Sequence, residues 1–469
     1  MESLLDQADA LLLIADEDGP SRPDFKIPEE LLHLTAPTDL LQVLENKNKG
    51  RGWFSMRDIS VGTILMVAKP LAWSLDCEWE LDEELEDENA MDDSQNPPES
   101  EASQINELLV LEVLQAIKEN PSIWLEQVSH LYPRDTTDIE TSPLWISKDK
   151  DILSQFEKTI DELESIPDLR GRSKEISTRL PLIVRYNVLS VETCPELLSY
   201  PGPNGHISLS GVGLYYLPSF FNHDARPNAS RYSVGDVMWF VANQDIPAGQ
   251  EVCISYLEHD VLCESVDRRN MMLTLDFEED EDANDLSMDD DGPVAPVVDS
   301  EVQNELMEMV PFERLEAISQ LMEQAAGEAL PDGESIDEDG MDAHGSAWFE
   351  CDMQNLRILK AITLDSMGQS VQALPLWEEC IQFSEVKVPP NDESSVVMRV
   401  QAALCAWYSK DEVRAKHHAQ VALHVHNIVF GGGIARFRRR YRKEFSLNLR
   451  PDKGTKSLSV QDILWPYRS

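Results

Sequence analysis

The sequence predicts an α+β protein in which a β-rich first half carries a helical insertion and an α-helical region follows. Short apolar runs typical of strands lie at residues 39–75 and 207–256. Between them, residues 104–190 carry apolar side chains at helical spacing. From about residue 305 onward the pattern is helical almost throughout. A chain of 469 residues is long enough for two or three domains.

The strand-type segments read GTILMVAKPLAW, RYSVGDVMWFVANQDI and EVCISY. In the second segment Gly235-Asp236 separates two apolar runs, which predicts a β-hairpin. In the third, alternation along a strand places Val252, Ile254 and Tyr256 on one face. We therefore expect Tyr256 to continue an inward-facing apolar row.

The helical segments begin with INELLVLEVLQAI and continue from Ile152 to Val188. In the C-terminal part, LRILKAITLDSMGQSVQALPLWEECIQF reads as a helix, a glycine-containing turn and a second helix. That pattern is typical of a tetratricopeptide-like (TPR-like) hairpin, although no clean second copy occurs. We predict a helical, TPR-like domain over residues 305–469.

Acidic residues dominate the charge, with 39 Lys plus Arg against 87 Asp plus Glu and a net charge of −48. Such a surface repels nucleic-acid backbones and anionic lipid, so neither a direct nucleic-acid partner nor a membrane is expected. A protein partner with a basic surface fits better. The alternative is that the excess lies in solvated loops and attracts nothing specific.

Much of the negative charge is concentrated in three stretches, which we predict to be disordered. They are an insertion over residues 76–103, a linker over residues 278–304, and the segment beginning at Pro331. Residues 1–38 form a separate N-terminal segment. Its apolar run has acidic flanks, so it is not a secretory signal.

The seven cysteines are scattered singly, which indicates neither a disulfide framework nor a zinc module. No run approaches the length of a membrane span. We expect a monomeric intracellular protein, cytoplasmic, nuclear or both. The basic run ARFRRRYRK, Ala435 to Lys443, is either a nuclear localisation signal or a segment that folds against the acidic body. The histidines of KHHAQVALHVH are expected to be ordinary helix residues rather than metal ligands.

Three separated motifs carry the functional signal. The first is Gly50-Arg51-Gly52 before a strand, where glycines let the backbone approach a ligand closely. The second is Asn222-His223 followed by Pro227-Asn228. The third is GQEVCISY, Gly249 to Tyr256.

In order and spacing these motifs resemble those of SET-domain protein-lysine methyltransferases, and the resemblance covers residues 39–277. It implies S-adenosylmethionine as cofactor and lysine methylation of a histone or non-histone protein as activity. It implies that Tyr256 is the catalytic residue, which orients the lysine amine. The cofactor-binding residues that it implies are Gly50, Arg51, Gly52, Asn187, Asn222, His223 and Phe277.

The chemistry is consistent with these residue types. Methyl transfer from a sulfonium is an in-line displacement, so catalysis is largely alignment and exclusion of water. The attacking lysine must be neutral although its free pKa is about 10.4. An apolar channel and the sulfonium charge both lower that pKa, and no metal is required. The alternative for Tyr256 is a core tyrosine with a satisfied hydroxyl.

The architecture is most similar to SET-and-MYND (SMYD) proteins, with two departures. Where the MYND zinc finger is expected, the chain has the acidic insertion, with Cys77 alone. The cysteine that joins the post-SET zinc site is replaced by Ala225, and no cysteine follows Leu273 in that region. We therefore predict no structural zinc. Without this loop, a catalytically inactive SET/TPR-like scaffold that binds protein partners is the alternative function.

Overall fold

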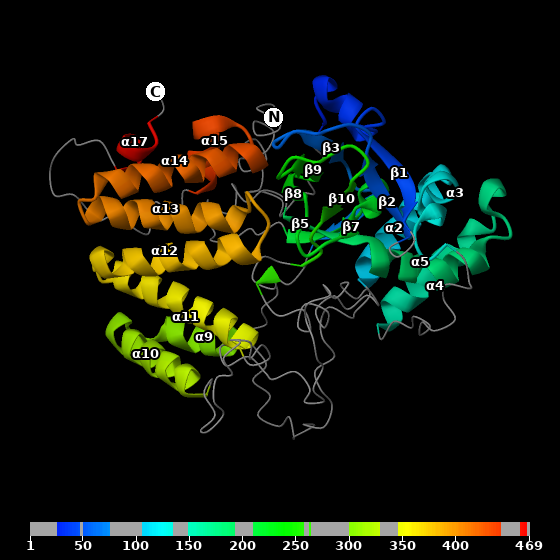
Figure 1. Ribbon diagram of the computed structural model, residues 1–469. Coiled ribbons are helices and arrows are strands. Elements are labelled where there is room, and N and C mark those ends of the chain that lie inside the picture. The colour runs from blue at the N-terminus through cyan, green and yellow to red at the C-terminus, as the bar shows by residue number, and fades with distance from the viewer. Residues whose placement is uncertain are drawn as a thin grey trace, which may run out of the picture.

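The computed structural model describes nine stretches of the chain (Figure 1). They are residues 26–46, 50–75, 106–134, 149–192, 210–257, 262–263, 300–328, 346–441 and 460–466. The predicted acidic insertion, most of the acidic linker and Phe277 lie outside the described residues.

In the described residues the strands form three small sheets. The first has the order β1 (Leu41–Asn46), β2 (Gly50–Ser55), β10 (Glu251–Ile254) and β7 (Asn222–His223). The second consists of β3 (Ile64–Ala68), β9 (Val237–Ala242) and β8 (Ala229–Val234). The third consists of β4 (Ala72–Leu75), β6 (Ser210–Leu214) and β5 (Val188–Glu192). The non-consecutive order means that distant segments of the chain meet in each sheet.

The predicted hairpin is confirmed between β8 and β9. Val234 pairs with Val237, so Gly235 and Asp236 form a two-residue loop. Gly235 adopts φ of +62°, a left-handed conformation that glycine adopts without steric cost. Inward-facing Trp239 and Phe240 then place this hairpin in the core.

Strand β10 pairs antiparallel with β2 and parallel with β7. Both of its faces are buried, since Val252, Cys253 and Ile254 are all at most 5% exposed. The prediction of a single inward face was therefore incomplete, because a central strand is covered on both sides. The strand ends at Ile254, so Tyr256 lies just beyond it rather than within it.

The insertion is helical as predicted. It contains α2 (Glu107–Glu119), α3 (Ser122–Glu126), η3 (Val128–His130), α4 (Lys150–Leu163), η5 (Pro167–Leu169) and α5 (Ser173–Asn187). Helix α2 is capped by Asn106, whose side chain accepts from the backbone N–H of Leu109. Its buried residues are Leu109, Val110, Val113, Leu114 and Ile117. The predicted helical boundary at residue 190 was wrong, because Val188 already begins β5. The β-branched Val188 and Val191 pair there with β6.

The C-terminal region is a row of helices, each packed on its neighbours in the sequence (Figure 1). It comprises α9 (Ser300–Glu308), α10 (Pro311–Glu328), α11 (Ser346–Ser366), α12 (Ser370–Lys387), α13 (Glu393–Tyr408), α14 (Glu412–Val429), α15 (Gly433–Arg440) and α17 (Val460–Leu464). The first helix begins at Ser300, five residues before the predicted boundary. A short η1 (Glu29–Thr35) packs on β3 at the other end of the chain.

The end of α14 joins the helical region to the β-rich region. Val429 and Phe430 belong to the same buried cluster as the sheets. The ring of Phe430 lies 5.1 Å from that of Tyr232 on β8, and Asn391 Nδ2 donates to the carbonyl of Asn243 at 2.7 Å. The basic run folds against this junction, because Arg436 donates to the Phe430 carbonyl and Arg440 pairs with Glu393. Arg436 and Arg440 therefore fold against the body of the protein, as one of the two interpretations of the basic run predicted.

Candidate functional site

The crossing of β2, β7 and β10 brings the three sequence motifs together. Gly52 lies on β2, Asn222 and His223 form β7, and Tyr256 follows β10. Cys253 pairs with Asn222, and Ile254 with His223. The parallel pairing of two very short segments places the motif side chains on one small area of the sheet.

Gly52 is required by close packing. A Cβ atom at this position would lie 2.3 Å from Glu251 Oε1 and 2.6 Å from Asn222 Nδ2. Such distances are far inside van der Waals contact. The neighbouring Gly50 has φ of +75° and open space where its Cβ would be, so the backbone is exposed to a ligand there.

Glu251 was missed among the sequence-predicted site residues, although it lies in the GQEVCISY motif. Its Oε1 accepts from Asn222 Nδ2 at 2.6 Å, and its Oε2 accepts from Asn46 Nδ2 at 2.6 Å. Asn222 Nδ2 also donates to the Arg51 carbonyl at 3.3 Å. One carboxylate thus links the ends of three strands.

The Arg51 side chain points away from this crossing. It donates to the His130 carbonyl in the helical insertion, and its guanidinium lies 4.9 Å from the centre of the Phe220 ring. Burial, together with the nearby Arg134, lowers the pKa of Arg51 from its ordinary value. Only its backbone carbonyl therefore belongs to the site.

Tyr256 is held from two directions. Its backbone N–H donates to His223 Nδ1 at 3.1 Å, and its hydroxyl donates to the Phe221 carbonyl at 2.8 Å. Burial raises the pKa of the Tyr256 phenol above its ordinary value, with smaller contributions from Cys253 and Glu251. The phenol therefore stays neutral at physiological pH and acts through hydrogen bonding.

His223 is buried, and its role in these contacts is structural. Since Nδ1 accepts from the Tyr256 N–H, the ring is fixed with its acceptor toward that residue. The two rings lie 5.4 Å apart. His223 thus positions Tyr256, and its role toward a cofactor stays a prediction.

Asn228 fixes β10 by a different means. Its Oδ1 accepts from the Cys253 N–H at 2.9 Å, and its Nδ2 donates to the Glu251 carbonyl at 2.8 Å. The residue is 5% exposed. One buried amide therefore satisfies a backbone donor and a backbone acceptor that the short ladders leave open.

Asn187 ends α5, and its printed contacts lie in the helical insertion. Its Nδ2 donates to the carbonyls of Tyr132 and Ile183, at 2.7 and 2.8 Å. Both amide hydrogens are therefore used away from the β2–β7–β10 crossing. Its role toward a cofactor stays a prediction, and the same holds for Phe277.

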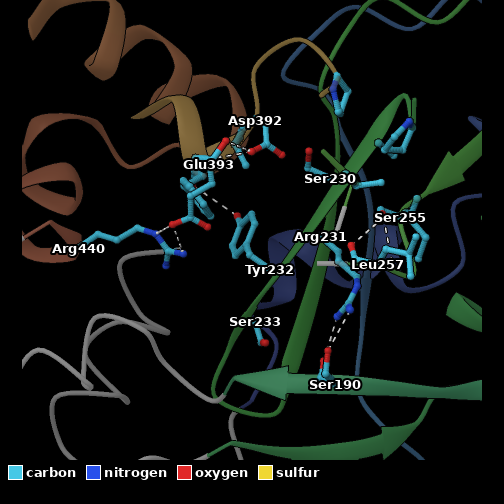
Figure 2. A pocket seen from close by; sticks show the side chains of 18 residues that line it. Ser190, Ser230, Arg231, Tyr232, Ser233, Ser255, Leu257, Asp392, Glu393 and Arg440 are labelled. Carbon is cyan, nitrogen blue, oxygen red and sulfur yellow. Dashed lines mark hydrogen bonds and ion pairs between the residues drawn. The ribbon is translucent and has the colours of Figure 1, made fainter. Parts of the chain in front are cut away.

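A cavity of about 370 Å³ lies between the β-rich region and the helical region (Figure 2). Its lining includes β8 residues from Ala229 to Ser233, Ser255 and Leu257 on either side of Tyr256, and the beginning of α13. Arg231 bonds the carbonyl and hydroxyl of Ser190 on β5 at 2.9 and 3.0 Å. The cavity therefore opens next to the residues that flank Tyr256.

Charged side chains on the helical wall of the cavity are paired. Glu393 Oε1 accepts from Arg440 at 2.7 and 2.8 Å. Asp392 accepts from the Ser394 N–H at 2.9 Å and begins α13. The cavity thus combines these fixed charges with the apolar side chains of Leu257 and Phe430.

Within the described residues, no group of three or more His, Cys, Asp or Glu side chains is arranged to hold a metal ion. The segments where the MYND finger and the post-SET site would lie are outside those residues. No helix in the described part of the chain is long and apolar enough to cross a membrane.

Residues 50–257 match the SET domain family. Among solved structures, the chain is similar to the crystal structure of the SET domain of LSMT bound to lysine and AdoHcy. The identity is 12%, the match covers 78% of this chain and 92% of that one, and the TM-score is 0.22. No curated protein matches. Residues 50–257 thus form a SET domain, which a helical C-terminal region follows.

Proposed function

We propose that the chain is a protein-lysine N-methyltransferase that uses S-adenosylmethionine. The observation that carries the proposal is the meeting of Gly52, Asn222 and Tyr256 at the β2–β7–β10 crossing of a SET domain. A core tyrosine alone does not account for the close packing of Gly52 and Asn222 around Glu251.

The residues present fit the cofactor. Gly50 leaves open space beside its backbone, and Asn222 Oδ1 and the Arg51 carbonyl are acceptors suited to an ammonium group. Gly50, Arg51, Gly52, Asn222 and His223 would hold S-adenosylmethionine. When bound, it supplies an activated methyl group on a sulfonium.

Tyr256 would align the lysine amine. Its neutral hydroxyl donates its one hydrogen to the Phe221 carbonyl, so the phenol oxygen offers an acceptor to the lysine amine at a fixed position. Such preorganisation contributes alignment without proton removal by a strong base. The apolar residues around Tyr256 favour the neutral amine that the reaction requires.

The substrate would be a protein with a basic surface, bound along the cavity between the two regions. Ser255 and Leu257, the chain neighbours of Tyr256, line this cavity, and the helical region supplies its second wall. We further propose a SMYD-like architecture with a TPR-like helical domain and with neither a MYND finger nor a post-SET zinc site. The protein would be a monomer in the cytoplasm, the nucleus or both.

The test is titration calorimetry with S-adenosylmethionine and S-adenosylhomocysteine, followed by transfer of labelled methyl groups to basic proteins. Tyr256→Phe should lower methyl transfer by about 100-fold or more while the affinity for S-adenosylhomocysteine stays unchanged. Loss of both would mean that Tyr256 is structural. Absence of binding by the natural chain at millimolar ligand would leave the scaffold alternative as the function.

A further inference from the structure

We infer that Glu251 is a positioning residue: its carboxylate fixes the Asn222 amide so that Oδ1 faces the ammonium group of the cofactor. The inference rests on the proposed function and extends it to a residue that does not itself touch the ligand. It follows from the hydrogen bonds at the β2–β7–β10 crossing.

The orientation of the Asn222 amide is set by its partners. Nδ2 donates one hydrogen to Glu251 Oε1 at 2.6 Å and the other to the Arg51 carbonyl at 3.3 Å. A carboxylate and a carbonyl can only accept. Rotating the Asn222 amide by half a turn would therefore place its Oδ1 against two acceptors, with no hydrogen between them. Oδ1 is the polar atom that remains for a ligand, and as an acceptor it suits a cation.

Glu251 is itself anchored. Oε2 accepts from Asn46 Nδ2 at 2.6 Å, at the end of β1. Gly52 lies directly beneath, where a Cβ would come within 2.3 Å of Oε1. The carboxylate therefore has little room to move, and its reach to Asn222 depends on the full length of the glutamate side chain.

Two roles of Glu251 are possible and can be separated. If the negative charge of Glu251 attracts the ammonium group, then ligand affinity depends on that charge and not on the length of the side chain. If Glu251 instead positions Asn222, then ligand affinity depends on an acceptor atom at the position of Oε1 and not on the charge. Glu251→Gln keeps the reach and loses the charge, since Asn46 can turn its amide to accept from the new Nε2. Glu251→Asp keeps the charge and is one methylene shorter.

The experiment is calorimetric titration of each variant with S-adenosylhomocysteine and with 5′-methylthioadenosine, which lacks the amino-acid part. We expect Glu251→Asp to weaken S-adenosylhomocysteine binding by about 10-fold or more, with less than about a 2-fold effect on 5′-methylthioadenosine. Glu251→Gln should bind both ligands within about 3-fold of the natural chain. Glu45→Asp on β1 is the matched control, because Glu45 is exposed and pairs with Arg134 at 3.6 Å.

Three outcomes would overturn the inference: equal losses for the two ligands in Glu251→Asp, natural affinity in Glu251→Asp, or a loss in Glu251→Gln as large as that in Glu251→Asp. Thermal unfolding shows whether each variant is folded. If Glu251→Asp does not fold, Glu251→Met, which removes the acceptor at similar volume, takes its place with the same expected selectivity. If the natural chain binds neither ligand, the proposed function fails. Binding by the natural chain with unselective losses refutes only the role of Glu251.

Discussion

Hydrogen bonds at the β2–β7–β10 crossing join residues far apart in the chain, whereas the polar contacts of α12, α13 and α14 join residues much closer in the chain. Asn46 and Glu251 are separated by 205 positions, and Arg51 and Asn222 by 171. In the helical region, Arg399 and Glu385 are 14 positions apart, and His418 and Glu378 are 40 apart. The first arrangement requires the whole SET domain, and the second requires only adjacent helices.

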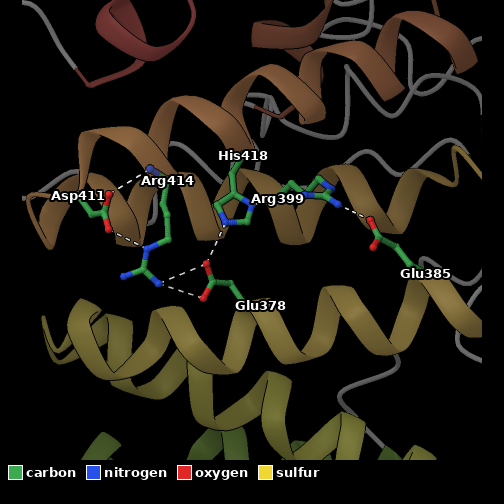
Figure 3. A network of polar contacts seen from close by, with 6 residues as sticks. All are labelled: Glu378, Glu385, Arg399, Asp411, Arg414 and His418. Carbon is green, nitrogen blue, oxygen red and sulfur yellow. Dashed lines mark hydrogen bonds and ion pairs between the residues drawn. The ribbon is translucent and has the colours of Figure 1, made fainter.

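Figure 3 shows the helical example, a polar network across α12, α13 and α14. His418 lies between Arg399, whose Nη1 is 3.4 Å from Nδ1, and Glu378, whose Oε1 is 3.3 Å from Nε2. Since the guanidinium only donates, Nδ1 is the acceptor and Nε2 carries the proton. Arg414 joins the same carboxylate at 3.2 Å. His418 on α14 thus links Arg399 on α13 with Glu378 on α12.

From this difference we expect a substitution at the crossing to disturb several strands at once. A substitution in the helical row should disturb only the neighbouring helices. At the crossing, one short strand, β10, contacts β2, β7 and the amide of Asn228. From α9 to α15 each helix packs mainly on its predecessor and successor. When one contact in such a row is removed, the loss is expected to stay mostly with the neighbouring helices.

The largest effect is expected for Gly52→Ala. Its Cβ would collide with Glu251 and Asn222, so the affinity for S-adenosylhomocysteine should fall by about 100-fold or more, and the free energy of unfolding by about 1–3 kcal/mol. Calorimetry and urea unfolding measure the two effects. Gly171→Ala, at a left-handed turn with open space around it, is the control and should leave binding unchanged. Natural affinity in Gly52→Ala would show that the crossing is not tightly packed.

An effect on stability, with no accompanying loss of about 100-fold in ligand affinity, is expected to separate Asn228 from Asn243. Asn228→Ala removes both bonds that hold β10 and leaves the Cys253 N–H buried, which should cost about 2–4 kcal/mol in urea unfolding. Asn243 bonds residues 13 and 16 positions away, Ser230 and Pro227. Asn243→Ala should cost less. Equal losses would refute the view that long-range contacts dominate this region.

In the helical row, Arg399→Met should lower the free energy of unfolding by only about 1 kcal/mol. Its partner Glu385 has a half-exposed side chain, so water can replace the lost ion pair, and the methionine keeps the apolar packing of the stem. S-adenosylhomocysteine affinity should not change. A loss as large as that of Asn228→Ala, measured in the same urea experiment, would remove the contrast between the two regions.

The smallest effect is a pH dependence from His418. Burial lowers the pKa of this histidine below its ordinary value, although Glu378 partly opposes the shift. The folded state therefore favours the neutral ring, and its contribution to stability is present above the ordinary pKa of about 6.5 and is lost as pH falls through the folded value. Thermal unfolding between pH 7 and pH 5 should show a steeper decline in the natural chain than in His418→Gln. A parallel decline in both would exclude His418 as the source.

Local patterns were sufficient for many elements. The Gly235-Asp236 pair predicted the β8–β9 hairpin, and the apolar spacing of residues 104–190 predicted the helical insertion. Boundaries were less certain, since β5 begins at Val188 and α9 at Ser300. The start of β5 depends on its pairing with β6, and the local sequence pattern around Val188 contains no information about that distant partner.

The site divides in the same way. Gly52, Asn222, His223 and Tyr256 were found because the motif residues are distinctive in type and spacing. The role of Asn46 could not be found, because its partner Glu251 lies 205 positions away. Glu251 itself carried a signal, its place in the Gly249–Tyr256 motif, but nothing in the sequence indicates which amide it binds.

The sequence alone determined the α+β class, the hairpin, the amphipathic helices and the identity of the motif residues, because these depend on side-chain periodicity and turn chemistry within a few residues. Only the tertiary structure decided that β10 lies between β2 and β7 with both faces buried, that Glu251 joins three strand ends, and that Ser255 and Leu257 line a cavity shared with the helical region. The reason is that these features arise from contacts between distant segments, whose geometry is set only when the whole core packs.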